Sequence, residues 1–133
     1  MKRTVLTLLT LILIFSPVRI AAADTGTDTA ALLSAYIGGC DAARDIASMT
    51  AVGAVIMNRC AADRYPDTIT ANGASLGILP TPAPSPIAVY SARLVLSGLD
   101  PTSGALSFFP ESEAPAHTDE YITFSSSGLC FVK

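Results

Sequence analysis

Hydrophobic residues recur at three- and four-residue spacing before residue 60, and this spacing predicts a helix that starts at Ala42 or Asp45 and ends at Cys60. The residues that carry this spacing are Ile46, Met49, Val52, Gly53, Ile56 and Cys60. Val55 and Met57 extend the apolar surface almost around the helix, so we expect it in the centre of a small core. Gly53 lowers helix propensity by about 1 kcal/mol relative to Ala, which indicates a closely packed neighbour.

Two further helices are predicted by their end signals. Asp28 and Thr29 can cap a helix from Ala30 to about Ile37, which Gly38-Gly39 ends. Ser85 as cap and Pro86 at the first helical position begin another helix, which continues through Val95 and is closed by Gly98. We expect the apolar face of this helix to pack on the central one.

The segment between the last two helices contains turn signals. Asn72-Gly73 predicts a turn, and the four prolines from Pro80 to Pro86 predict an irregular loop. Beyond Gly104 the pattern changes to short β signals at residues 105–109, 121–124 and 129–132. Residues 125–128 are expected to connect the last two strands, and residues 111–118 to form an exposed loop. The sequence therefore predicts an α+β domain with three main helices and a small antiparallel sheet.

The first 23 residues have the layout of a secretory signal peptide. Lys2 and Arg3 precede an apolar run, and the segment ends in Ala21-Ala22-Ala23. The apolar run is short for a membrane span, so we expect cleavage after Ala23 and no stable span afterwards. The alternative is that the leader is retained as an amino-terminal anchor. Residues 24–133 are then one mature domain, secreted or associated with the cell envelope.

The net charge and the small number of possible metal ligands limit the partners and cofactors that the chain can bind. Loss of the leader removes three of the eight basic side chains and none of the eleven acidic ones, which moves the formal net charge from −3 to −6. Such a balance argues against nucleic acid as a partner. Few ligand residues are available, so no metal or other cofactor is expected. Among Cys40, Cys60 and Cys130, a Cys60–Cys130 disulfide is slightly favoured, and the alternative is that all three are buried thiols.

Three motifs in order carry a resemblance to a known family. They are the helix Val52–Arg59 with Tyr65-Pro66-Asp67-Thr68-Ile69, the helix from Ser91-Ala92-Arg93 to Gly98, and the turn Asp100-Pro101-Thr102-Ser103-Gly104-Ala105. Together they resemble the SleB/CwlJ family of bacterial cell wall hydrolases. The resemblance implies a lysozyme-like fold related to lytic transglycosylases, and cleavage of the glycan strands of peptidoglycan.

The position of the catalytic acid departs from that family. Its pattern is Glu-Ala-Arg-Gly-Glu, and counting back from Val52 without gaps places Cys40 at the first glutamate. A one-residue deletion would place Asp41 there, as a shorter acid. The alternative interpretation of Asp41, which we favour, is a cap for a helix starting near Ala42.

Other residues match the family better. The resemblance implies substrate contacts by Asn58, Arg59, Tyr65, Tyr90 and Asp100. A structural role is the alternative for each, and His117 is interpreted as a solvated side chain. We expect a SleB-like hydrolase or lytic transglycosylase, with activity impaired because the catalytic glutamate is missing. The alternative is an inactive domain that binds peptidoglycan or a partner.

Overall fold

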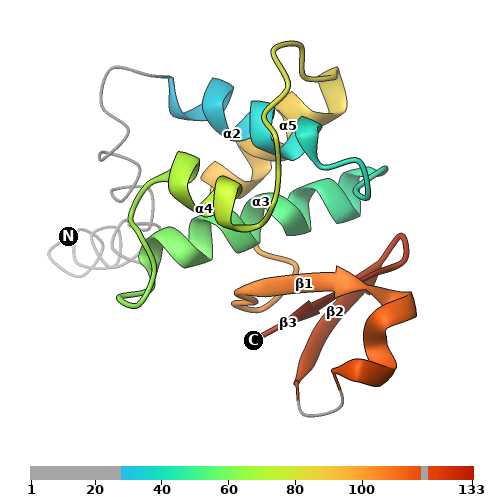
Figure 1. Cartoon of the computed structure of the whole chain (residues 1–133). Helices are drawn as coiled ribbons and strands as arrows, with labels where there is room; N and C mark the ends of the chain where they lie inside the picture. The colour runs from blue at the N-terminus through green and yellow to red at the C-terminus, as the bar shows by residue number, and fades with distance from the viewer. Residues whose placement is uncertain (1–27, 118–119) are drawn as a thin grey trace, which may run out of the picture.

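The computed structural model describes residues 28–117 and 120–133, so the expected leader lies outside the described residues. Four helices are followed by a three-stranded sheet that carries a short 3-10 helix (Figure 1). The elements are α2 (Thr29–Gly39), α3 (Ile46–Ala61), α4 (Ile69–Ser75), α5 (Pro86–Leu96), β1 (Ser107–Pro110), η2 (Glu111–Ala116), β2 (Ile122–Ser126) and β3 (Leu129–Val132). The α+β class expected from the sequence is confirmed.

Helix α3 is the centre of the molecule, as its apolar spacing predicts. Val52, Val55 and Ile56 are fully buried, and α2, α4 and α5 all pack on this helix. A Cβ on Gly53 would lie 2.7 Å from Ile37 Cδ1 and 3.0 Å from a Val95 methyl. The glycine therefore allows α2 and α5 to approach α3 closely.

The sequence allowed α3 to start at Ala42 or at Asp45, and the structure supports the second start. Asp45 is the N-cap, its carboxylate accepts the Ser48 N–H at 2.8 Å, and the helix begins at Ile46. The Ser48 hydroxyl completes a capping box with the Asp45 backbone. The interpretation of Asp41 as a cap is therefore wrong, because the helix starts four residues later.

Helices α2 and α5 begin as predicted. The carboxylate of Asp28 accepts the Ala30 N–H at 2.9 Å, and the Ser85 hydroxyl accepts the Ala88 N–H at 3.2 Å. Gly98 follows α5 with a φ of 105°, a left-handed conformation that glycine adopts without a Cβ clash.

Helix α4 was not predicted, and the turn expected at Asn72-Gly73 is wrong. Both residues lie inside α4, where Thr68 caps the helix by accepting the Ala71 N–H at 3.1 Å. Asn72 is fully buried and its amide donates to the Pro66 carbonyl at 2.7 Å. A Cβ on Gly73 would lie 2.3 Å from the ring of Tyr36. Tertiary packing thus explains both residues, which local turn preference alone cannot do.

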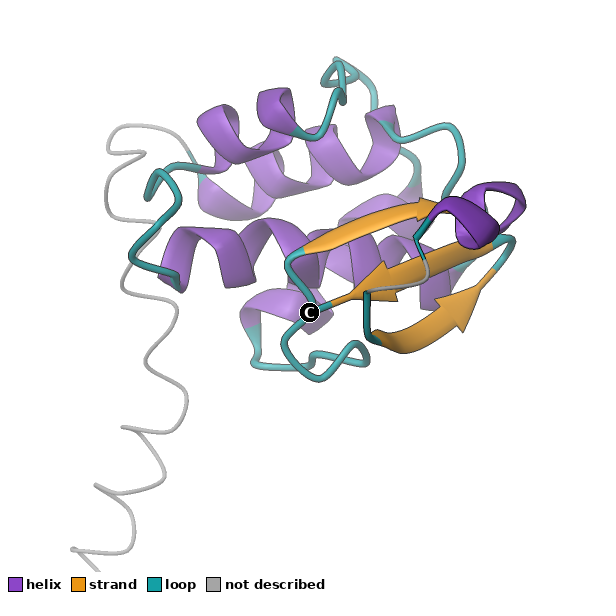
Figure 2. Ribbon diagram, turned by 60° about the horizontal axis from the view of Figure 1, so that its bottom comes forward, coloured by secondary structure: helices purple, strands orange, loops and turns teal. Residues whose placement is uncertain are grey.

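The sheet has the order β1-β3-β2, with both pairs antiparallel and β3 in the middle. Leu129 and Phe131 belong to the core shared with the helices, whereas Cys130 and Val132 pack with Phe109 in a second small cluster. The sheet thus lies against the helical layer with one face and against η2 with the other (Figure 2).

Two details of this region differ from the predictions. The β2–β3 turn has only two residues, Ser127 and Gly128, with φ of 52° and 78°, so residues 125 and 126 belong to the strand. Residues 111–116 form η2, and His117 stacks on Phe109 with ring centroids 4.0 Å apart. His117 is thus a packed side chain, about a third exposed, and not simply a solvated one.

Cys130 forms no disulfide, so the favoured Cys60–Cys130 pairing is wrong. All three cysteines are buried, which agrees with the alternative interpretation. Within residues 28–117 and 120–133, no helix has the length and apolar character needed to cross a bilayer.

Candidate functional site

Cys40, the residue at the expected position of the catalytic acid, directly follows α2. It is the C-cap of that helix and is only 8% exposed. Burial raises the pKa of the Cys40 thiol, while the backbone N–H groups of Ala43 and Ala42 oppose the shift. The thiol therefore stays protonated at neutral pH and packs within the hydrophobic core.

Asp41 is exposed in the turn between α2 and α3. The Ala43 N–H donates to the Cys40 carbonyl at 3.1 Å and closes this turn. Asp41 and Asp45 are four residues apart, the same spacing as the two glutamates of the Glu-Ala-Arg-Gly-Glu pattern. This spacing suits the one-residue deletion, which places Asp41 at the first acidic position.

Asp45 is already engaged in structural contacts. Its carboxylate accepts hydrogen bonds from the Ser127 hydroxyl at 2.6 Å and from the Ser48 hydroxyl at 2.6 Å. The hydrogen bonds from Ser127 and Ser48 lower the pKa of Asp45 to about 2, so its charge is held at neutral pH. A group of this kind is unsuited to donating a proton. Asp41 is therefore the better candidate acid of the two.

An apolar segment, Leu79-Pro80, lies against Gly39 at the end of α2. The Thr81 N–H donates to the Ala35 carbonyl at 3.0 Å and fixes this segment to the helix. A Cβ on Gly39 would lie 1.8 Å from the Leu79 carbonyl oxygen, so only glycine fits at this contact. Leu79 itself is 82% exposed. The surface beside the expected acid position is thus apolar and supplies few groups that could hold sugar hydroxyls.

Asn58 and Asp100 are brought together. The Asn58 amide donates to the Asp100 carboxylate and to the Ala105 carbonyl, both at 3.0 Å. Asp100 also accepts the N–H and hydroxyl of Thr102 and the N–H of Gly104. Burial is the largest single influence and raises the pKa of Asp100, but the hydrogen bonds from Thr102, Asn58 and Gly104 together lower it. These contacts hold the turn before the sheet onto α3, while sugar contact by either residue remains a prediction.

Arg59 and Tyr65 form a second pair. Arg59 is 8% exposed, and its guanidinium carbon lies 4.7 Å from the centroid of the Tyr65 ring. Its Nε donates to the Leu106 carbonyl at 2.6 Å and its Nη1 to the Ser75 hydroxyl at 2.9 Å. Arg59 thereby connects α3, α4 and the chain entering β1.

Tyr90 is separate from these pairs. It lies on α5 and is 52% exposed, so its ring is accessible to a ligand. The structure thus pairs Asn58 with Asp100 and Arg59 with Tyr65, while Tyr90 belongs to neither pair.

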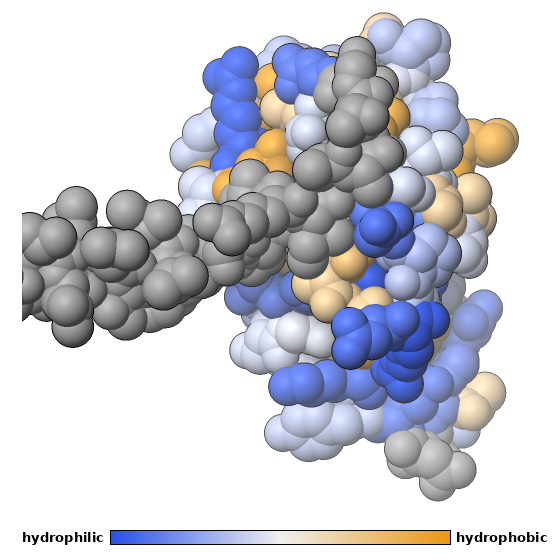
Figure 3. All heavy atoms as spheres, turned by 90° about the vertical axis from the view of Figure 1, so that its left-hand side faces the viewer, coloured by the Kyte–Doolittle hydropathy of each residue, from blue (hydrophilic) through white to orange (hydrophobic). Residues whose placement is uncertain are grey.

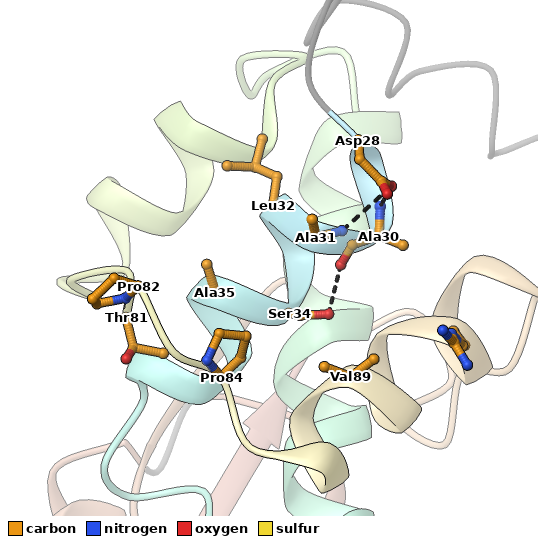
Figure 4. Close-up of a pocket in the computed structure, with 11 residues that line it drawn as sticks. Asp28, Ala30, Ala31, Leu32, Ser34, Ala35, Thr81, Pro82, Pro84 and Val89 are labelled. Atoms are coloured by element: carbon orange, nitrogen blue, oxygen red, sulfur yellow. Dashed lines mark hydrogen bonds between the residues drawn. The ribbon is translucent and has the colours of Figure 1, made fainter.

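Two hollows lie on the helical layer. One of about 220 Å³ lies beside Asn58 and Asp100, with Met57, Val95 and Leu99 among its walls. The other, of about 470 Å³, lies between α2, α5 and residues 81–84 (Figure 4). In the second hollow, Asp28 and Ser34 are occupied by hydrogen bonds within α2, and most other walls are apolar. Neither hollow is lined by Cys40 or Asp41.

The contacts of Asp45 with Ser127 and of Arg59 with Ser75 were missed by sequence reasoning. Asp45 and Ser48 do have capping-box spacing, which is a usable local signal. The other contacts join segments 82 and 16 residues apart, and no local pattern marks them. In the part of the chain that the structure describes, no group of three or more His, Cys, Asp or Glu residues could hold a metal ion.

Comparison with known proteins gives similarity at the level of structure. No family model matches the chain, and no curated protein matches it. The catalytic domain of the Bacillus cereus SleB protein superposes with a TM-score of 0.65 at 21% identity, covering 82% of this chain and 94% of that one. The catalytic domain of the germination-specific lytic transglycosylase SleB from Bacillus anthracis gives 0.64 at 20% identity, covering 82% and 98%. The chain therefore has the fold of the SleB catalytic domains, as its motifs predict.

Proposed function

We propose that this chain is an exported SleB-like domain directed at the glycan strands of peptidoglycan, with impaired cleaving activity. Support comes from the fold that it has in common with a lytic transglycosylase domain and from the order of the three sequence motifs. The impairment follows from one observation, which is the buried thiol of Cys40 at the expected acid position. Asp41 is then the carboxylate left to act as acid.

The chemistry explains why this replacement weakens cleavage. Glycan cleavage needs an acid that protonates the glycosidic oxygen, and in a transglycosylase the same group then acts as base. Asp41 is one methylene shorter than glutamate, so its carboxyl group lies about 1 Å short of the oxygen that glutamate would reach, a misplacement that costs about 100-fold in rate. We therefore expect slow cleavage that depends on Asp41.

Release of soluble muropeptides measures this activity. Purified protein is incubated with cortex and with vegetative peptidoglycan, and the products are analysed for anhydro and reducing ends. Asp41→Asn is expected to abolish release, whereas Asp63→Asn, at another exposed aspartate, is the matched control and retains it. Equal release by the wild-type protein and Asp41→Asn would reject Asp41 as the acid.

A second candidate function is an inactive module that binds peptidoglycan. The observation that favours it is the combination of a buried Cys40 with the apolar segment fixed against Gly39. Co-sedimentation with insoluble peptidoglycan, measured beside muropeptide release, separates the two candidates. Binding without release supports the module, release supports the enzyme, and the absence of both rejects the peptidoglycan assignment.

A further inference from the structure

Two arginines flank one aromatic ring at the end of α3, and we propose that Arg59, Arg64 and Tyr65 form an anion-binding site for a carboxylate or phosphate group. The site lies at the C-terminal end of α3 and in the loop that leads to α4. Figure 3 looks onto the side of the molecule that Figure 1 shows at left, where this loop lies, and strongly hydrophilic residues gather there. The inference concerns the anion alone and does not depend on glycan cleavage.

Within the described residues, Arg59 lacks an acidic counter-ion. Its side chain is buried, yet no carboxylate among residues 28–117 and 120–133 lies within 4.0 Å of its guanidinium nitrogens. Burial lowers the pKa of Arg59, and the nearby charge of Arg64 lowers it further, while the electrostatic interaction with Tyr65 raises it. A buried cation without an acidic partner is costly, and a bound anion would remove that cost. The last turn of α3 offsets only part of it through the helix dipole.

Arg59 also has N–H donors that remain unused in the part of the chain that the structure describes. An arginine carries five N–H donors in a planar fork. The two hydrogen bonds of Arg59, from Nε to Leu106 and from Nη1 to Ser75, leave the Nη2 group and one Nη1 hydrogen available. These two contacts also hold the guanidinium in a fixed orientation. A planar, oriented fork with unused N–H groups matches the geometry of a carboxylate or phosphate.

Arg64 lies beside the same aromatic ring. Its guanidinium carbon lies 5.3 Å from the centroid of the same Tyr65 ring that Arg59 contacts at 4.7 Å. Two cations therefore lie beside one ring, in a domain whose other charges are mostly acidic. Asp63 directly precedes Arg64 and Asp67 follows it by three residues, but neither forms an ion pair with Arg59 or Arg64. Arg64 is exposed, so an anion can reach the pair from solvent.

Titration with small anions tests the site. The folded domain is followed by ¹⁵N NMR, including the arginine Nε–H signals, while chloride is replaced by inorganic phosphate or by acetate at constant ionic strength. Signals of Arg59, Arg64 and Tyr65 are expected to shift and to saturate in the millimolar range. Saturation with acetate alone identifies a carboxylate ligand and saturation with phosphate alone identifies a phosphate ligand. Absence of shifts at these residues with both anions overturns the proposal.

Two variants make the test specific. Arg64→Gln removes one of the two positive charges of the site. It is therefore expected to weaken binding of the anion that saturates the wild-type protein, phosphate or acetate, by about tenfold. Arg93→Gln, at an exposed arginine on α5, is the matched control and should bind as the wild-type protein does. The same anion should raise the melting temperature of the wild-type protein and of Arg93→Gln more than that of Arg64→Gln. Equal binding by Arg64→Gln and wild type contradicts the site.

Discussion

The Ser127 hydroxyl donates a 2.6 Å hydrogen bond to the Asp45 carboxylate, which joins the β2–β3 turn to the first residue before α3. The two residues are 82 positions apart in the chain. The same carboxylate accepts the Ser48 N–H at 2.8 Å, so one side chain both caps the central helix and fastens the sheet to the helical layer.

Removal of the Asp45 carboxylate is expected to destabilise the domain. Asp45→Ala loses the cap of α3, which costs about 0.5–2 kcal/mol, together with the bond to Ser127. Urea denaturation measures the change in the free energy of unfolding. Asp63→Ala, at an exposed aspartate in the loop after α3, is the control and should change it by less than about 0.5 kcal/mol. Equal stability of the two variants would contradict the fastening role of Asp45.

Stability is also expected to fall at acid pH through Asp45. The pKa of Asp45 is lowered from 3.8 to about 2 in the folded state, so its charged form stabilises the fold above about pH 4. That contribution is lost as the pH falls from about 4 to about 2. Asp45→Asn keeps a capping side chain and removes the titration. The difference in unfolding free energy between wild type and Asp45→Asn should shrink between pH 5 and pH 2; a constant difference would refute this prediction.

Several helix ends could be predicted from the sequence because their signals are local. Asp28, Ser85 and Gly98 mark helix ends by their own side chains or backbone, and the structure confirms all three. Asn72 and Gly73 show the opposite case, because their preference for turns is overridden by contacts with Pro66 and Tyr36. Such contacts depend on the tertiary fold, so a single sequence does not reveal them.

Asp100 is expected to be required for stability whether or not it touches a sugar. Asp100→Ala removes the acceptor for the Asn58 amide, for the Thr102 N–H and hydroxyl, and for the Gly104 N–H. Because Thr102 is fully buried, we expect a loss of about 2–4 kcal/mol. Chemical denaturation checks this value, and Asp67→Ala, at an exposed aspartate, is the control. A loss below about 1 kcal/mol would show that solvent replaces these bonds.

The contact between Gly39 and Leu79 predicts a local effect of a single methyl group. In Gly39→Ala the new Cβ would overlap the Leu79 carbonyl, which lies 1.8 Å from its position. We expect a loss of about 1–3 kcal/mol and release of the Thr81 N–H from the Ala35 carbonyl. Hydrogen exchange at Thr81 measures that release. Gly77→Ala, where no atom lies within 4 Å of the added Cβ, should leave the exchange of Thr81 unchanged despite its own strain at a φ of 76°. Slow exchange in Gly39→Ala would contradict the contact.

The candidate site was predictable only as a position along the chain. The spacing from Val52 led to Cys40 and Asp41, but burial distinguishes the two and is not visible in the spacing. Asp45 was a possible helix start in the sequence, and only the contact with Ser127 shows that its carboxylate is occupied. For this site, the structure therefore contributes accessibility and hydrogen-bond occupancy.

A glutamate placed at residue 41 or at residue 40 tests which of the two is the position of the catalytic acid. Asp41→Glu adds one methylene at an exposed residue, so it should fold like the wild-type protein and raise muropeptide release if the acid lies at Asp41. Cys40→Glu instead places a carboxyl group in the core, where burial raises its pKa above the unfolded value of about 4.3. Its stability relative to wild type should therefore fall as the pH rises from 4 to 7. Circular dichroism melts across this range, with Cys40→Gln as the uncharged control, measure the effect. A pH-independent difference would mean that the glutamate at residue 40 reaches solvent, and a gain of glycan cleavage by that variant would then place the acid position at Cys40.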